Sequence, residues 1–173
     1  IILEKRYPLS LPELIGQSEA LLKEKMNRPP EEVKKDVLDF LRTRYQYFLL
    51  DKGYPFDVID AVFTTSFDEL LDVQGRIDAL RQAKSLPDFD SLVIGFKRAM
   101  NILKGSPSTK ELNLSLLSDP AEKSLYQSFL DTKAKIEPHL VRRDYMQAIS
   151  ELTGLRKPIV DFFNGVMVMV EET

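Results

Sequence analysis

The sequence predicts an all-α fold. Apolar residues recur at three- and four-residue steps along most of the chain, and no alternating strand pattern extends beyond a few residues. Prolines and capping motifs divide these periodic stretches into separate helices. With 173 residues, 43% of them hydrophobic and 29% charged, the chain fits one ordinary domain or two small ones that share a core.

The first half of the chain contains clear start and stop signals for helices. Ser10, followed by Leu-Pro-Glu, forms a capping box with proline in the first turn. A second helix begins at Pro29–Pro30 and ends at Gly53, because glycine accepts the left-handed conformation that closes a helix. A short helix follows Pro55, and we expect Ser66 to cap the next one through a second capping box.

The second half contains the most amphipathic helix of the sequence, followed by a Ser-rich loop at 105–118. Asp119 and the Pro-Ala-Glu after it predict the start of the next helix. We expect Pro138 to separate that helix from one that ends at Gly154, and Pro158 to begin the last. The apolar stripe of the amphipathic helix consists of Phe89, Leu92, Val93, Phe96, Met100 and Leu103. We expect six side chains to be largely buried in one core: Phe89, Phe96, Met100, Phe162, Phe163 and Val166.

The composition excludes several kinds of chemistry. The chain has no cysteine, so thiolate metal sites, disulfides and cysteine nucleophiles are impossible. A single histidine, His139, rules out a multi-histidine metal centre and argues strongly against a metal-dependent hydrolase. No phosphate-binding Gly-rich loop or Gly-x-Ser-x-Gly elbow occurs. We therefore predict neither a catalytic nor a metal site in this chain, and no apolar run predicts a membrane span.

Charge is distributed unevenly along the chain. The total is −3, from 24 basic and 27 acidic side chains, which argues against a polybasic protein and against DNA as a partner. Residues 1–73 have 10 basic and 14 acidic residues, whereas residues 74–173 have 14 and 13. An anion-binding surface is therefore more consistent with the second part, and the change in charge suggests a boundary near residues 72–76.

Polar and basic residues gather on one flank of the amphipathic helix. Relative to Phe89 at 0°, and at 100° a residue, they lie between about 60° and 180° on the helical wheel. Cations neutralise phosphates, and arginine or asparagine can also hydrogen-bond to base edges. This flank is a candidate RNA-binding surface, although the same pattern also fits a solvated helix face. Its members are Lys97, Arg98, Asn101 and Lys104.

Several segments together resemble the β subunit of bacterial glycyl-tRNA synthetases. The similarity follows the same order along essentially the whole chain, and the two later segments are the most specific in combination. The matching segments are Leu9–Ile15, Lys52-Gly53-Tyr54 with Asp57–Val62, Arg76–Leu80, Phe96–Lys104, and Lys157–Phe163 with Val166–Met169. On this resemblance, we expect the chain to be a piece of a larger cytoplasmic protein.

The resemblance implies two parts. Residues 75–173 would form a helical anticodon-binding domain of the DALR type, and residues 1–74 would be the helical end of the β-subunit body. The family continues past Val166–Met169 into a further helix, so the domain would be truncated at its C-terminus here. Any anticodon contacts on that helix would lie outside this chain.

The expected function is binding of the anticodon arm of glycine tRNA in support of aminoacylation. The resemblance implies a glycyl-tRNA synthetase α subunit as partner in an α2β2 enzyme, and ATP and Mg used by that whole enzyme, with no cofactor held by this chain. Arg76 joins the helix flank as a predicted tRNA-binding residue, and Arg142 and Arg143 are the next places to search. The alternative is a helical protein-interaction or subunit-docking module without RNA contact.

Overall fold

The computed structural model describes residues 1–105 and 112–166, and within them every regular element is a helix apart from one isolated bridge between Ser10 and Glu69. The prediction of an all-α chain is confirmed. The chain divides into two compact units, Ile1–Arg81 and Gln82–Thr173. This division falls within helix α5 (Leu70–Ala83), later than the boundary expected between residues 74 and 75.

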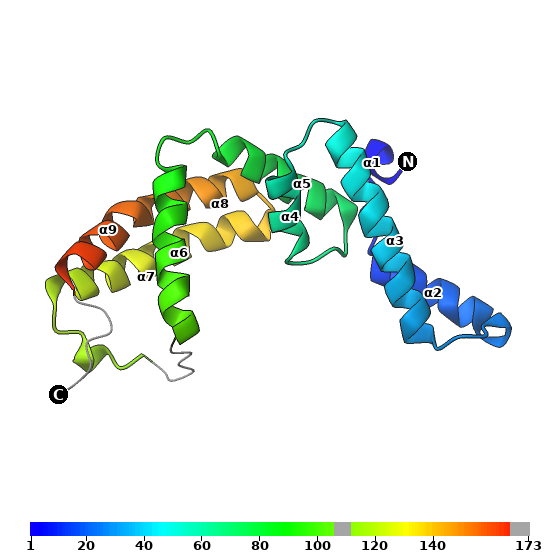
Figure 1. The fold of residues 1–173 in the computed structure, drawn as a ribbon, viewed down its shortest axis with the longest axis horizontal. Coiled ribbons are helices and arrows are strands. Elements are labelled where there is room, and N and C mark those ends of the chain that lie inside the picture. Colours follow the sequence, from blue (N-terminus) through cyan, green and yellow to red (C-terminus); the bar gives the residue numbers. More distant parts are fainter. Residues whose placement is uncertain (106–111, 167–173) are drawn as a thin grey trace. The chain divides into compact units, whose positions relative to one another are not determined.

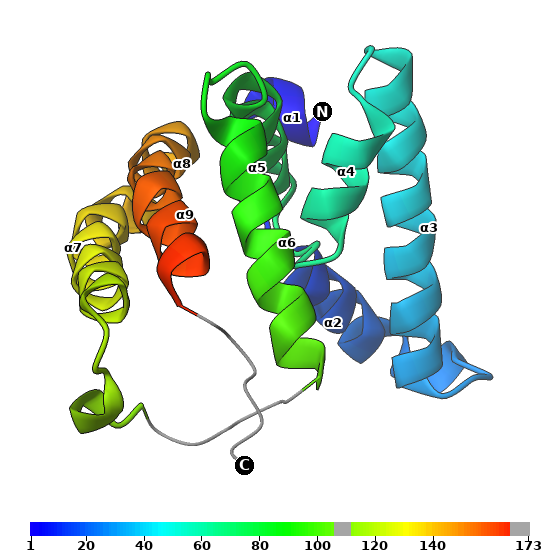
Figure 2. The same cartoon turned by 60° about the vertical axis from the view of Figure 1, so that its left-hand side comes forward.

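The first unit comprises α1 (Ile2–Lys5), α2 (Leu11–Leu22), α3 (Pro30–Asp51), α4 (Phe56–Phe63) and most of α5, with a 3-10 turn at Lys23–Lys25. Ser10 caps α2 as predicted, since its hydroxyl oxygen accepts a hydrogen bond from the Glu13 amide at 3.3 Å. Gly53 follows α3 with φ of 79°, the left-handed conformation expected of a helix stop. Figures 1 and 2 both show α2 lying beside the first half of α3.

The core of the first unit is formed where α3, α4 and α5 meet. Its buried members are Tyr45, Leu49, Val58, Ile59, Val62, Phe63, Val73 and Ile77. The ring of Tyr45 lies 6.1 to 6.2 Å, centroid to centroid, from the rings of Phe48, Phe63 and Phe67. This aromatic cluster joins α3, α4 and the loop before α5.

That loop is held differently from what the sequence predicted. α5 begins at Leu70, so Ser66 is not its N-cap. Instead, both the carbonyl and the hydroxyl oxygen of Ser66 accept hydrogen bonds from the guanidinium of Arg76, at 3.0 and 3.1 Å. A side chain from the following helix supplies the donors that order the loop, and local sequence patterns do not report such a contact.

The second unit comprises α6 (Phe89–Gly105), α7 (Pro120–Val141), α8 (Tyr145–Leu152) and α9 (Arg156–Gly165), with 3-10 turns at Leu114–Leu116 and Thr153–Leu155. α8 and α9 pack along α7, and α6 packs against α9 (Figure 2). Asp119 forms the predicted capping box with Glu122. Pro138 does not separate two helices: it lies in the last turn of α7, which continues to Val141. The proline removes one N–H donor from α7, and the packing of this helix against α8 and α9 outweighs that local cost.

The core of the second unit is small. Leu92, Leu155 and Ile159 are buried, and Leu125, Leu152 and Phe163 pack around them. The six-residue core expected from the sequence is only partly correct. Phe89, Phe162, Phe163 and Val166 are half-buried, whereas Phe96 and Met100 are exposed. No helix in the described ranges is long and apolar enough to cross a membrane.

Candidate nucleic-acid interface

Helix α6 packs through a row of small and aliphatic residues. Leu92 is 2% exposed, and Ala99 and Ile102 are half-buried. At Gly95 the backbone comes so close to α9 that an added Cβ would lie 2.8 Å from Cγ2 of Ile159. These positions lie at about 220° to 300° on the wheel with Phe89 at 0°. The packed face of α6 is therefore centred near 260°.

The apolar stripe expected to face the core is thus rotated to one side. Phe96, Met100 and Leu103 are 37%, 55% and 52% exposed. The physical reason is Gly95, whose lack of a side chain allows the backbone of α6 to approach Ile159 more closely than a larger residue would. An isolated glycine inside a helical pattern is the signal that could have identified this seam.

The polar flank lies opposite the packed face. Lys97, Asn101 and Lys104 are all exposed, and their wheel positions of about 60° to 120° surround the direction directly away from the seam. Among the residues that the structure describes, none of the three makes an ion pair or a side-chain hydrogen bond. Two cations and one amide thus form an open row over about two turns of α6.

Arg98 has a separate role at the edge of this row. Its guanidinium carbon lies 4.1 Å above the centre of the Phe163 ring on α9, a cation–π distance. The nearby acidic residue of α9, Asp161, pairs with Lys157. Arg98 therefore joins α6 to α9 while its charge stays on an exposed residue beside the polar row.

Arg76 belongs to the first unit and is part of its framework. Its Nε lies 2.9 Å from Asp72 Oδ2, and its other nitrogens hydrogen-bond to Thr65 and Ser66. With its side chain 18% exposed, it presents little free surface. The structure thus groups Lys97, Arg98, Asn101 and Lys104 on one helix and places Arg76 in the other unit.

The reserve candidates lie at the C-terminal end of α7. Arg142 follows the helix, with one guanidinium nitrogen 3.4 Å from Nδ1 of His139. Arg143 adopts a left-handed backbone conformation, with φ of 56°. His139 Nδ1 lies 3.7 Å from Asp144 Oδ2. Within residues 1–105 and 112–166, no three histidine, aspartate or glutamate side chains gather in a manner that could hold a metal ion.

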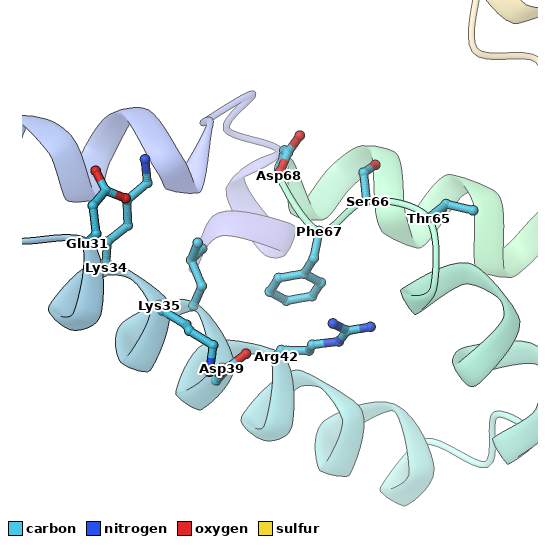
Figure 3. A pocket seen from close by; sticks show the side chains of 10 residues that line it. Glu31, Lys34, Lys35, Asp39, Arg42, Thr65, Ser66, Phe67 and Asp68 are labelled. Atoms are coloured by element: carbon cyan, nitrogen blue, oxygen red, sulfur yellow. Dashed lines mark hydrogen bonds and ion pairs between the residues drawn. The ribbon is translucent and has the colours of Figure 1, made fainter.

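A pocket of about 520 Å³ lies between α3 and the loop that precedes α5 (Figure 3). Its charges balance, since three basic and three acidic side chains line it: Lys34, Lys35 and Arg42 against Glu31, Asp39 and Asp68. Lys35 Nζ lies 3.2 Å from Asp39, and Arg42 donates to the carbonyl of Phe63. Because Lys35 and Arg42 serve contacts within the chain and the acidic side chains match the basic ones in number, this pocket shows no preference for an anion.

The fold and the α6 face together define an all-α chain that presents cations and an amide on one exposed helix surface, groups that RNA-binding surfaces use for phosphates and base edges. No family model matches the chain. Curated relatives do, among them the glycine–tRNA ligase β subunits of Syntrophus aciditrophicus, Geobacter sulfurreducens and Geotalea daltonii, which are 41%, 40% and 39% identical to it over 99% of its length.

The chain spans about a quarter of the length of each of these relatives. Over nearly all its residues it is homologous to a segment of the glycine–tRNA ligase β subunit, which confirms the resemblance inferred from the motifs.

Proposed function

We propose that this chain is a tRNA-contacting segment of a glycine–tRNA ligase β subunit, and that the exposed face of α6 contacts the anticodon arm of glycine tRNA. In this proposal, residues 75–173 correspond to the DALR-type domain, and the aminoacylation chemistry, with its ATP and Mg, belongs to the rest of a cytoplasmic enzyme that includes an α subunit. The carrying observation is that Lys97, Asn101 and Lys104 point away from the packed seam of α6 without a partner among the described residues.

Each group would have a distinct task. Lys97 and Lys104 would neutralise backbone phosphates, which contributes affinity regardless of sequence and weakens with salt. Asn101 lies between the two lysines. Its amide nitrogen can donate and its amide oxygen can accept hydrogen bonds with the edge of a base. Arg98, held over Phe163, would add charge from a fixed position beside the row.

The test is the affinity of the full-length enzyme for glycine tRNA at two salt concentrations. Removing one phosphate contact should lower affinity about five- to eightfold at 0.1 M salt, since each neutralised phosphate contributes roughly 0.7 to 0.9 to the salt slope. We expect this for Lys97→Ala and Lys104→Ala. Lys123→Ala, which removes an exposed charge on α7, is the matched control and should bind like wild type.

Asn101→Ala tests base readout separately. If Asn101 contacts a base, its loss should weaken the binding of glycine tRNA by roughly 1–3 kcal/mol and leave the binding of an anticodon-mutated tRNA unchanged. If the lysine and asparagine variants all bind both tRNAs as wild type does, the α6 face is only a solvated surface and the proposal fails.

Subunit docking is the second candidate, and the exposed apolar row beside the cations favours it. Phe96, Met100 and Leu103 present large side chains to solvent along one edge of α6. Exposed apolar surface is typical of protein-binding sites. In that case Met100→Ser and Leu103→Ser should weaken association of the β subunit with the α subunit, while the lysine variants leave tRNA affinity unchanged.

A further inference from the structure

A second pocket in the first unit gathers cations around a small polar network. It has a volume of about 570 Å³ and lies among the end of α1, the end of α3 and helix α5. Arg6, Lys52 and Arg81 line it, and among the described residues Asp78 is the only acidic side chain that does so. The lining therefore has a net charge of about +2. Residues 1–81 as a whole contain 12 basic and 15 acidic residues, a net charge of −3, so this concentration of positive charge is local.

The carboxylate of Asp78 accepts its hydrogen bonds from uncharged side chains. The Tyr54 hydroxyl donates to one oxygen of Asp78 at 2.7 Å, and the Gln74 amide nitrogen donates to the other at 3.1 Å. Gln74 is fixed in turn by the Tyr45 hydroxyl, which donates to its carbonyl oxygen at 2.6 Å. Both carboxylate oxygens of Asp78 thus accept hydrogen bonds from neutral groups. Among the described residues, Asp78 forms no ion pair with the cations of the pocket.

The cations rest against aromatic rings instead of carboxylates. The guanidinium carbon of Arg81 lies 4.5 Å from the centre of the Tyr54 ring, and Nζ of Lys52 lies 5.7 Å from that of Phe48. Arg6 is exposed and has no partner side chain within the described part of the chain. Among the described residues, none of the three cations forms an ion pair. Aromatic rings orient the charges without neutralising them.

We propose that this pocket binds a backbone phosphate of RNA, and, resting on the proposed function, that it is a second tRNA contact of the enzyme. Long exposed side chains supply the donors, which is how proteins neutralise a phosphate backbone, whereas no Gly-rich backbone cradle lies here to enclose a free nucleotide. Phe48, 45% exposed beside Lys52, also offers a ring face on which an unpaired base can stack.

The test again measures affinity for glycine tRNA by the full-length enzyme at two salt concentrations. Lys52→Ala and Arg81→Ala should each lower affinity about five- to eightfold at 0.1 M salt and reduce the salt slope by roughly 0.7 to 0.9. Arg81→Lys keeps the charge and should keep the slope. Lys25→Ala removes an exposed cation outside the pocket, in the 3-10 turn after α2, and should bind like wild type.

Arg6→Gly separates loss of binding from loss of folding. Arg6 has φ of 52°, a left-handed conformation that glycine adopts without strain, so this variant should melt no lower than wild type. It should nevertheless bind tRNA about five- to eightfold more weakly. Wild-type affinity in Arg6→Gly, Lys52→Ala and Arg81→Ala together would overturn the inference, whether or not the α6 variants lose binding.

The two proposals fail in distinguishable ways. Loss of binding only in the Lys97 and Lys104 variants leaves the α6 interface standing and refutes the pocket, and loss only in the pocket variants does the reverse. Inorganic phosphate and ATP should not bind the pocket with dissociation constants below 1 mM in calorimetry. If they bind that tightly, and Lys52→Ala abolishes the binding without changing tRNA affinity, the pocket is a small-anion site and the RNA assignment is wrong.

Discussion

Tyr45 connects the apolar core of the first unit to its polar network. Its ring is 7% exposed among other aromatic side chains, while its hydroxyl donates to Gln74. Burial raises the pKa of Tyr45 well above its ordinary value near 10, and the neighbouring Tyr54 and Asp78 charges raise it further. The pKa of Tyr54 is also raised, mainly by burial and then by its hydrogen bond to Asp78. Both phenols are therefore held neutral by the fold.

These tyrosines predict a loss of stability at high pH. A group whose pKa is higher in the folded state than in the unfolded chain contributes stability that is complete below the unfolded value and declines above it. The free energy of unfolding should thus begin to fall as the pH rises through about 10. Denaturant midpoints measured between pH 8 and pH 11.5 check this.

Tyr45→Phe identifies the source of the effect. This variant loses roughly 1 kcal/mol at pH 8, because one hydrogen bond to Gln74 disappears. Its stability should fall less steeply above pH 10 than that of wild type. An identical alkaline decline in both proteins would show that Tyr45 does not contribute to it.

At the scale of elements, the contact between α6 and α9 depends on a glycine. A Cβ added at Gly95 would lie 2.8 Å from Cγ2 of Ile159, and Ile159 is 8% exposed. Ile159 is β-branched and lies within the small core of the second unit, so it has little freedom to move aside.

A pair of identical substitutions with opposite expected effects tests this contact. Gly95→Ala should destabilise the fold by roughly 1–3 kcal/mol, because the new methyl group overlaps the Ile159 side chain. Gly16→Ala, within α2, places its methyl group where no atom lies within 4 Å, and should stabilise by roughly 0.5–1 kcal/mol through helix propensity. Chemical denaturation of the two variants decides, and a stabilised Gly95→Ala would contradict the packed seam.

Local signals in the sequence predicted the helices well, but not what their faces contact. Ser10 and Asp119 cap their helices as expected because a cap is formed by neighbours within four residues. The loop at Ser66 depends on Arg76, ten residues away, and the packed face of α6 depends on Gly95 meeting Ile159. Apolar periodicity shows that a helix is amphipathic, but the neighbouring helix that packs most closely against it determines which face is buried.

At the scale of the whole molecule, positive charge is concentrated in two places on a chain that is acidic overall. The exposed face of α6 lies in residues 82–173, which contain 12 basic and 12 acidic residues. The pocket lined by Arg6, Lys52 and Arg81 lies in the acidic first unit. The sequence predicted the first because its members share one helix. It did not predict the pocket, since Arg6, Lys52 and Arg81 come from three distant segments that only the fold brings together.

If both surfaces bind the same tRNA, their contributions should add. The double variant Lys52→Ala/Lys104→Ala should lower the logarithm of the affinity by the sum of the two single effects, because each lysine releases its own counterions. Affinities of the four enzymes at 0.05 and 0.2 M salt measure this. A double variant no weaker than either single one would indicate that the two lysines do not bind the RNA independently.

The uneven packing of α6 has a consequence for amide exchange. Its N-terminal turns contact α9 at Leu92 and Gly95, whereas Met100, Leu103 and Lys104 near its C-terminal end are exposed. Hydrogen exchange monitored by mass spectrometry should therefore show slow exchange around residues 92–96 and faster exchange around residues 100–104. Binding of glycine tRNA to the exposed face should slow exchange mainly in the fast part, so that the ligand extends slow exchange along the length of the helix.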